Sequence, residues 1–213
     1  MEKALILLSG GIDSATCLWW AKSRNWLVYA LSFNYYRRSK REIMSSEILA
    51  KEGKVKEHIV IDLPFLKEAF DLKLKVIPSI YIPARNLIFY SIAIYLSEIY
   101  EFNYIVGGHN TDDQAIFPDA KSEYFQLLNQ IINKTLLTGK EVKIITPLSN
   151  LKKFEVVKLG KELGVPFEYT WSCHRDYLLP CKECEGCKSR EEAFKRAGIK
   201  DPLEDTSHTS LQL

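Results

Sequence analysis

Residues 4–14 read Ala-Leu-Ile-Leu-Leu-Ser-Gly-Gly-Ile-Asp-Ser, and this stretch decides the fold. The apolar first half has the length and composition of a strand that is buried on both faces. The two glycines let the backbone curl so that successive N–H groups converge on an anion. A helix that begins near Ser14 adds the positive end of its dipole. The stretch therefore predicts a strand, a phosphate-binding loop and a helix, in that order.

The residues of the loop favour adenylation with release of pyrophosphate over phosphoryl transfer. The candidate nucleotide-binding residues are Ser9, Gly10, Gly11, Ile12, Asp13 and Ser14. Asp13 can cap the helix or help hold a Mg²⁺ ion that bridges phosphates. The sequence lacks the GxxxxGK[ST] pattern of a Walker loop, and SGGxDS resembles the pyrophosphate loop of the adenine-nucleotide α-hydrolase superfamily, whose members adenylate their substrate. The alternative is a tight strand-to-helix turn in which Asp13 or Ser14 is only a cap.

Outside this loop, apolar strand-like runs alternate with stretches of helical period, which is typical of βαβ units in a parallel sheet. We expect an open, doubly wound α/β sheet of the adenine-nucleotide α-hydrolase type. The predicted strands are Ala4–Leu8, Leu27–Phe33, His58–Ile61, Tyr104–Val106 and Lys143–Ile145. The predicted helices are Ser14–Lys22, Arg38–Lys51, Asn86–Tyr100, Ser122–Leu137, Leu151–Leu163 and Lys188–Ala197.

Three regions follow from this pattern: an α/β ATP-pyrophosphatase core (1–165), a four-cysteine segment with its helix (166–202) and a polar tail expected to be disordered (203–213). The 29 Lys and Arg nearly balance the 27 Asp and Glu, so we expect no direct nucleic-acid binding. The longest uncharged run, 86–97, is shorter than the roughly 20 residues of a membrane span. No basic or cleavable leader pattern is seen, so we expect a cytoplasmic protein without membrane contact.

Four of the five cysteines cluster near the C-terminus, and the metal-ligand candidates are Cys173, Cys181, Cys184 and Cys187. Spacings of two residues let a chain wrap one tetrahedral ion, and sites of four cysteines are usually closed and structural. We therefore predict one structural Zn²⁺ per chain. The alternatives are an iron–sulfur cluster, although the fourth cysteine followed by proline of ferredoxin-type motifs is absent, and four unligated thiols.

The chain resembles the 7-cyano-7-deazaguanine synthases of queuosine and archaeosine biosynthesis. The resemblance rests on SGGIDS, on Ile82-Pro83-Ala84-Arg85-Asn86, and on the ending TWSC…CKECEGCKSREEAFKRAGIKDP. It implies a ligase that uses ATP to adenylate the carboxylate of 7-carboxy-7-deazaguanine and converts it with ammonia to 7-cyano-7-deazaguanine (preQ0). The resemblance further implies that AMP and pyrophosphate are released, that an amide is the intermediate, and that the protein is a homodimer.

By the same resemblance, the strand end at Ser32 and Phe33 seats adenine. Arg85 and Asn86 begin a helix, where an arginine fork suits a carboxylate or phosphate; a surface helix start is the alternative. Asp113 and Asp119 align with the substrate loop of the family. They would bind Mg²⁺ or the donors of the purine-like ring, and solvated loop carboxylates are the alternative.

The chain departs from the family pattern at Tyr36, Arg37, Ser39 and Ala120. These positions leave the ATP loop intact but alter regions expected to meet the deazapurine and ammonia. One alternative is therefore a related enzyme that stops at the amide, or that joins the activated deazaguanine to a protein amine as in antiviral defence. A more remote alternative is an RNA-binding zinc knuckle that uses Lys182, Lys188, Arg190, Lys195 and Arg196.

Overall fold

A computed structural model describes residues 1–36, 38–69, 71–75, 81–177 and 179–204. Its sheet consists of five parallel strands in the order β3-β2-β1-β4-β5. The strands are β1 (Lys3–Leu7), β2 (Leu27–Tyr35), β3 (His58–Leu63), β4 (Tyr104–Val106) and β5 (Lys143–Ile145). The helices are α1 (Ile12–Lys22), α2 (Lys40–Glu52), α3 (Arg85–Tyr100), α4 (Thr111–Ile116), α5 (Ser122–Thr135), α6 (Lys153–Glu162) and α7 (Glu185–Ala197). Two 3₁₀ turns, η1 (Pro118–Ala120) and η2 (Phe167–Tyr169), complete these elements.

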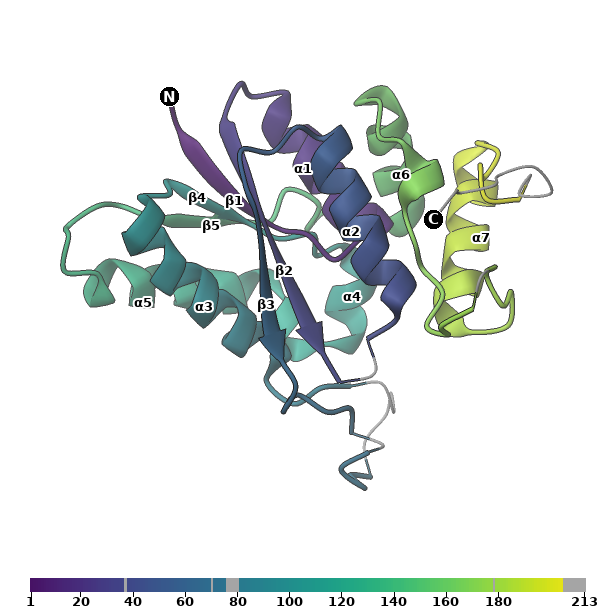
Figure 1. The fold of residues 1–213 in the computed structure, drawn as a ribbon, viewed down its shortest axis with the longest axis horizontal. Coiled ribbons are helices and arrows are strands. Elements are labelled where there is room, and N and C mark those ends of the chain that lie inside the picture. Colours follow the sequence, from purple (N-terminus) through teal and green to yellow (C-terminus); the bar gives the residue numbers. More distant parts are fainter. Residues whose placement is uncertain (37, 70, 76–80, 178, 205–213) are drawn as a thin grey trace.

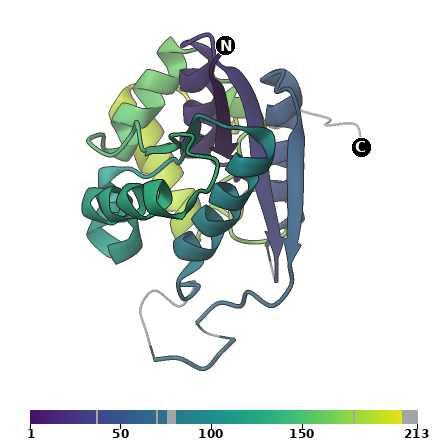
Figure 2. The same cartoon turned by 90° about the vertical axis from the view of Figure 1, so that its left-hand side faces the viewer.

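Helices cover both faces of the sheet (Figure 1). One apolar core joins the sheet to α1, α2, α6 and α7, and the other joins it to α3 and α5. The view turned by 90° shows α3 and α5 toward the viewer, with α6 and α7 farther away (Figure 2). The chain runs outward from β1 to β3 and then returns to β4, so the strand order reverses between β1 and β4. The predicted doubly wound parallel α/β fold is therefore confirmed, and ligands of such sheets bind at this reversal.

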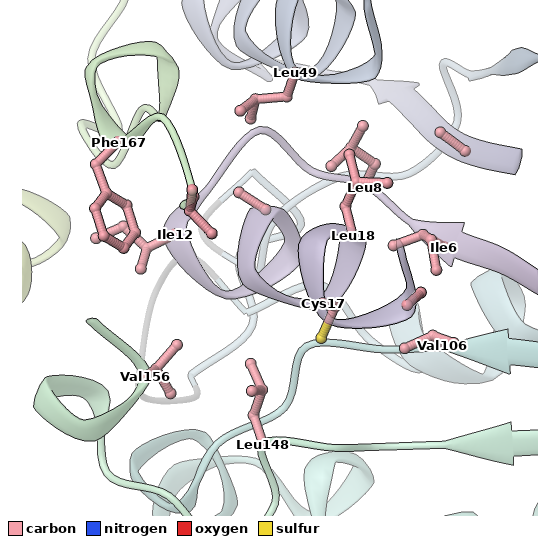
Figure 3. Close-up of a cluster of buried hydrophobic side chains, with 14 of the residues drawn as sticks. Ile6, Leu8, Ile12, Cys17, Leu18, Leu49, Val106, Leu148, Val156 and Phe167 are labelled. Atoms are coloured by element: carbon pink, nitrogen blue, oxygen red, sulfur yellow. The ribbon is translucent and has the colours of Figure 1, made fainter. Parts of the chain in front are cut away.

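The first core is built around α1, whose buried residues face both the sheet and the C-terminal helices. Figure 3 shows Ile6, Leu8 and Val106 of the sheet side against Leu18, with Val156 and Phe167 on the far side. Cys17 is fully buried within this cluster and acts as a small apolar side chain. Apolar packing on both sides explains why β1 reads as an unbroken hydrophobic run.

All predicted strands and helices are confirmed, and their ends differ from the predicted ones by at most three residues. The helix α4 and both 3₁₀ turns were missed. α4 has only six residues, no buried ones, and a capping box formed by Asn110 and Asp113. A helix stabilised by its cap carries no hydrophobic period to detect.

The C-terminal helix α7 belongs to the main core through Ala193 and Phe194. Beside them, Arg190 is buried and makes a two-bond ion pair with Asp201, at 2.6 and 2.8 Å. Arg190 also donates to the carbonyls of Phe167 and Thr170. This arginine is therefore committed to the fold, which contradicts its place in the RNA-binding alternative.

Among the described residues, no helix is both long and apolar enough to span a bilayer. Of the predicted C-terminal tail, Leu203 and Glu204 are described, and residues 205–213 lie outside the described residues, as does Arg37.

Candidate active site

The phosphate loop occupies the turn between β1 and α1, as its glycines suggested. The Ser9 and Ser14 hydroxyl oxygens are 3.1 Å apart, and the backbone N–H of Gly11 donates to Ser9 Oγ at 3.3 Å. Ser14 Oγ also accepts from the backbone N–H of Ser9 at 3.1 Å. The two hydroxyls therefore lie together at the start of α1, where its helix dipole favours an anion.

Two glycines are required by close approach of the backbone. Gly10 has φ +93°, and a Cβ there would lie 2.4 Å from the Glu42 carbonyl oxygen of α2. A Cβ on Gly108, which follows β4, would lie 2.9 Å from the Asp13 carbonyl carbon. The loop is thus enclosed between α2 on one side and the end of β4 on the other.

A cleft of about 250 Å³ opens at the carboxyl end of the sheet, beside the strand-order reversal. It is lined by Ser9, Asp13 and Ser14 of the loop and by Phe33 and Tyr35 of β2. Its other side chains come from α2, from the start of α3 and from the segment after β4, and include Arg38, Glu42, Arg85, Asn86, Phe89, His109, Asp113, Phe117 and Ala120.

Asp13 is held from two directions. Its Oδ1 accepts a hydrogen bond of 3.1 Å from the Asn110 side-chain amide, and its Oδ2 is ion-paired with the Lys153 ammonium group at the start of α6. Lys153 does not line the cleft. Asp13 is therefore a fixed carboxylate whose position depends on β4 and α6 as well as on its own loop.

Arg85 is the central charge of the cleft. Its guanidinium acts on the pKa values of Tyr35, Glu42, His109 and Asp113, which belong to separate parts of the chain. A guanidinium among these groups can bind a carboxylate or phosphate through its planar fork. This placement supports the ligand-binding interpretation of Arg85 over the surface interpretation.

Arg38 connects the phosphate loop to β2 through two carbonyl groups. It donates to the Ser9 carbonyl at 2.5 Å and to the Phe33 carbonyl, and its side chain is 3% exposed. Its Nε lies 3.8 Å from Glu42. Burial raises the pKa of Glu42, and Arg38 and Arg85 lower it. Arg38 is thus a buried support of the loop.

The two candidate aspartates have different surroundings. Asp113 lines the cleft, and burial together with the charge of Asp13 raises its pKa to about 6. The Asp119 carboxylate accepts a hydrogen bond of 3.4 Å from the Asn86 backbone N–H. The backbone carbonyl of Asp119 accepts a second one, of 3.0 Å, from the Asn86 side-chain amide. Asp119 therefore lies at the N-terminus of α3, outside the cleft lining.

The pair predicted to seat adenine is divided between the two faces of β2. Phe33 lines the cleft and stacks on Phe89, with ring centroids 4.0 Å apart. Ser32 is buried on the opposite face, where its hydroxyl donates to the Leu8 carbonyl at 2.6 Å and contacts His58 at 2.7 Å. Alternation along the strand separates neighbouring side chains in this way.

The four clustered cysteines converge on one point. Their sulfur atoms all lie within 4.8 Å of one another, and the pairs Cys181–Cys187 and Cys173–Cys184 are both 3.9 Å apart. A tetrahedral ion with Zn–S bonds of about 2.3 Å would separate its ligands by roughly 3.8 Å. The backbone N–H groups of Arg175 and Cys181 each approach Cys173 Sγ to 3.4 Å. The donor set therefore fits a single thiophilic metal ion.

This cysteine segment also contacts the phosphate loop. The Trp171 backbone N–H donates to the Gly10 carbonyl at 2.9 Å, and the indole N–H of Trp171 donates to the Cys173 carbonyl at 2.9 Å. Asp176 accepts from the Lys40 backbone N–H at 3.1 Å, at the start of α2. The metal-binding segment thus supports both the loop and the helix that covers it.

Sequence reasoning missed Lys153, His109, Arg38 and Glu42 as members of this region. Lys153 lies 140 positions from Asp13 along the chain, so no local spacing signals their contact. A helix start at the carboxyl end of a predicted sheet is the one signal that could have drawn attention to it.

Comparison with known proteins agrees with this geometry. Residues 3–198 match the family model described as "Queuosine biosynthesis protein QueC". The 7-cyano-7-deazaguanine synthase of Acetivibrio thermocellus is 38% identical over 98% of this chain and 100% of its own length. That of Coxiella burnetii is 40% identical over 96% and 98% of the two chains.

Solved structures share the fold at lower identity. A predicted subunit of tRNA methyltransferase from Methanocaldococcus jannaschii has a TM-score of 0.55 at 19% identity, and covers 95% of this chain and 91% of its own. The tRNA thiolase NcsA from Methanococcus maripaludis has a TM-score of 0.53 at 20% identity, with coverage of 92% and 67%. Because the sequence relationship extends over nearly the whole chain, this protein belongs to the QueC family of queuosine biosynthesis proteins.

Proposed function

We propose that this protein is an ATP-dependent C–N ligase that converts 7-carboxy-7-deazaguanine and ammonia to 7-cyano-7-deazaguanine. The observation that carries the proposal is a pyrophosphate loop at the strand-order reversal of a chain that aligns end to end with 7-cyano-7-deazaguanine synthases. A carboxylate is a poor electrophile, and adenylation turns its departing oxygen into part of a good leaving group, AMP. Ammonia then gives the amide, and a second activation removes its oxygen to leave the nitrile.

In this mechanism the loop from Ser9 to Ser14 holds the phosphates through its N–H groups and hydroxyls. Phe33, stacked on Phe89, offers an aromatic surface to adenine, while Ser32 supports the strand from behind. Arg85 draws the acid and the phosphates together, since it lines the cleft and its guanidinium fork suits both anions.

Asn86 and Asp119 position Arg85 by fixing the start of α3. Asp13 and Asp113 give the cleft two acidic side chains near the loop. Carboxylate oxygens are the donors that Mg²⁺ prefers, and Mg²⁺ supplies charge neutralisation of the transferring phosphates.

We further propose that the four cysteines hold one structural Zn²⁺, because their sulfur spacing suits its tetrahedral geometry. Free thiolate ligands persist in a reducing compartment, which supports a cytoplasmic location. Direct binding of nucleic acid is not part of the proposal, since charges of both signs are nearly equal in number.

We also propose a homodimer. Exposed apolar side chains lie on α3 and α5, the two helices that cover one face of the sheet: Leu87, Tyr95, Ile99, Leu127 and Ile131. An apolar surface distributed over two neighbouring helices is typical of a protein–protein contact. A second copy of the chain would bury it.

The decisive experiment follows nucleotides and bases by mass spectrometry after incubation with ATP, Mg²⁺, ammonium and 7-carboxy-7-deazaguanine. We expect AMP, pyrophosphate and the nitrile. Accumulation of the amide without nitrile would contradict the final step, and absence of acid-dependent AMP would contradict the ligase itself. Metal analysis of the same preparation should find about one zinc per chain; iron or no metal would contradict the zinc proposal.

A further inference from the structure

His109 is held against Tyr90 by a close approach that only glycine permits. Tyr90 of α3 is completely buried, and its hydroxyl lies 2.9 Å from His109 Nε2. A Cβ on Gly107 would lie 1.7 Å from that hydroxyl. The pair Gly107-Gly108 therefore leaves room for Tyr90 on one side and α1 on the other, and His109 follows them directly.

The protonation state of this pair follows from burial. Burial raises the pKa of Tyr90, so the phenol keeps its proton. Burial also lowers the pKa of His109 to about 4, which leaves the imidazole neutral at neutral pH. The Tyr90 hydroxyl is completely buried and its described partner is His109 Nε2, so the phenol must donate there to keep its O–H from being buried without an acceptor, and the single imidazole proton then resides on Nδ1. The Phe125 ring, with its centroid 4.8 Å from that of His109, limits rotation of the imidazole.

The Nδ1 atom is available to a ligand. His109 lines the cleft, and within the described part of the chain its side chain hydrogen-bonds to Tyr90 through Nε2 and not through Nδ1. His109 thus presents a fixed, uncharged donor to the cleft.

The position of His109 within the cleft indicates which of the two substrates it contacts. The aromatic pair proposed for adenine lies at the end of β2, whereas His109 follows β4, across the strand-order reversal. His109 shares the β4 side with Asp113 and Phe117 of the cleft lining. The acid substrate would occupy this side if the nucleotide occupies the other.

We propose that His109 is a specificity-determining residue that donates a hydrogen bond from Nδ1–H to the planar acid. Tyr90 positions His109 by donating its hydroxyl hydrogen to Nε2. This inference rests on the proposed function, because it assigns a contact to the acid of that reaction. An uncharged donor binds a carboxylate oxygen and an amide oxygen alike. His109 therefore retains both the acid and its amide through the successive steps, whereas a cation there would favour the acid.

The test compares three substitutions of His109 in the full-length, metal-loaded protein. His109→Asn places an amide N–H near the position of Nδ1, His109→Gln places one near Nε2, and His109→Leu removes both. The readouts are KM for 7-carboxy-7-deazaguanine, KM for the corresponding amide, and KM for ATP. Thermal melting and the KM for ATP show whether each variant is folded.

We expect His109→Leu and His109→Gln to raise both deazaguanine KM values about five- to tenfold, the worth of one uncharged hydrogen bond. His109→Asn should stay close to the unsubstituted protein, and KM for ATP should stay unchanged throughout. A raised KM for ATP alone, equal effects of Asn and Leu, or an effect on the acid but not the amide would each overturn the inference. If the unsubstituted protein itself fails to consume the acid, the proposed function fails instead.

Discussion

Asp13 shows how a single side chain of the loop depends on distant parts of the chain. The loop supplies its backbone, but Asn110 and Lys153 bind its two carboxylate oxygens from β4 and α6. One partner is an amide N–H donor and the other is an ammonium group, so both oxygens of the carboxylate are held in place. The Asp13 carboxylate is therefore fixed beside the loop proposed to bind phosphates rather than free to rotate into solvent.

Replacing Asp13 tests this arrangement. Asp13→Ala should lower acid-dependent ATP turnover about a hundredfold or more, because the fixed charge at the phosphate loop is lost. The zinc content and the melting temperature should change little. Pyrophosphate release is the measurement, and Glu192→Ala on the exposed face of α7 is the control for loss of an acid. Undiminished turnover in Asp13→Ala would refute the role given to the loop.

Lys153 is predicted to control the protonation of Asp113. The pKa of Asp113 is about 6, raised by burial and by Asp13 and lowered by Lys153. Lys153→Met removes the cation, so the Asp113 pKa should rise above about 6, and Lys153→Arg should largely preserve it. A carboxyl ¹³C NMR titration measures both. A fall in the Asp113 pKa in Lys153→Met would contradict the electrostatic account.

At the scale of elements, α7 carries the metal-binding segment to the phosphate loop. Its N-terminal turn holds Cys187, and its middle holds Arg190, which ties α7 to Asp201 and to the carbonyls of residues 167 and 170. The next residue, Trp171, bonds to Gly10 of the loop. The position of the loop therefore depends on how α7 is fixed.

Breaking this buried ion pair should be costly. Arg190→Met leaves Asp201 buried without its cation, and we expect a loss of about 3–5 kcal/mol in the free energy of unfolding. Arg196→Ala, which removes the half-exposed pair with Glu192, should cost less than about 1 kcal/mol. Urea denaturation at constant zinc concentration compares the two. Equal effects would show that Arg190 contributes no more than a surface charge.

For the molecule as a whole, strand order decides where the site lies. β1 and β4 are neighbours although about a hundred residues separate them, and the loop after each therefore faces the same cleft. The helices α3 and α5 lie at the opposite side of the molecule from α7 (Figure 1). A dimer formed through α3 and α5 would leave the metal-binding segment exposed at its ends.

Charged substitutions test whether the apolar surface of α3 and α5 forms the dimer interface. Tyr95→Asp with Ile131→Lys places charged groups on α3 and α5, where the side chains are 66% and 56% exposed. If the homodimer uses this face, light scattering should report a monomer for the double variant and a dimer for the unsubstituted protein. Phe65→Lys, at an exposed position after β3, should remain dimeric. A double variant that stays dimeric would place the interface elsewhere.

The sequence by itself determined the features that are local. The apolar run, the two glycines and the cysteine spacings indicated β1, the phosphate loop and the metal-binding cluster, because each depends on neighbouring residues. Helices α1 to α3 and α5 to α7 were also foreseen, since each buries an apolar side against the sheet. The capped helix α4 was not, because its stability comes from Asn110 and Asp113 rather than from a hydrophobic pattern.

Only the tertiary structure decided which side chains meet. Lys153 lies against Asp13, Ser32 points away from the cleft while Phe33 lines it, Asp119 lies at the start of α3, and Arg190 is buried. The physical reason is that these contacts depend on sheet order and on the packing of distant helices. Sheet order and the packing of distant helices produce no periodic pattern in the sequence. The backbone conformation and the burial of a local segment do produce one.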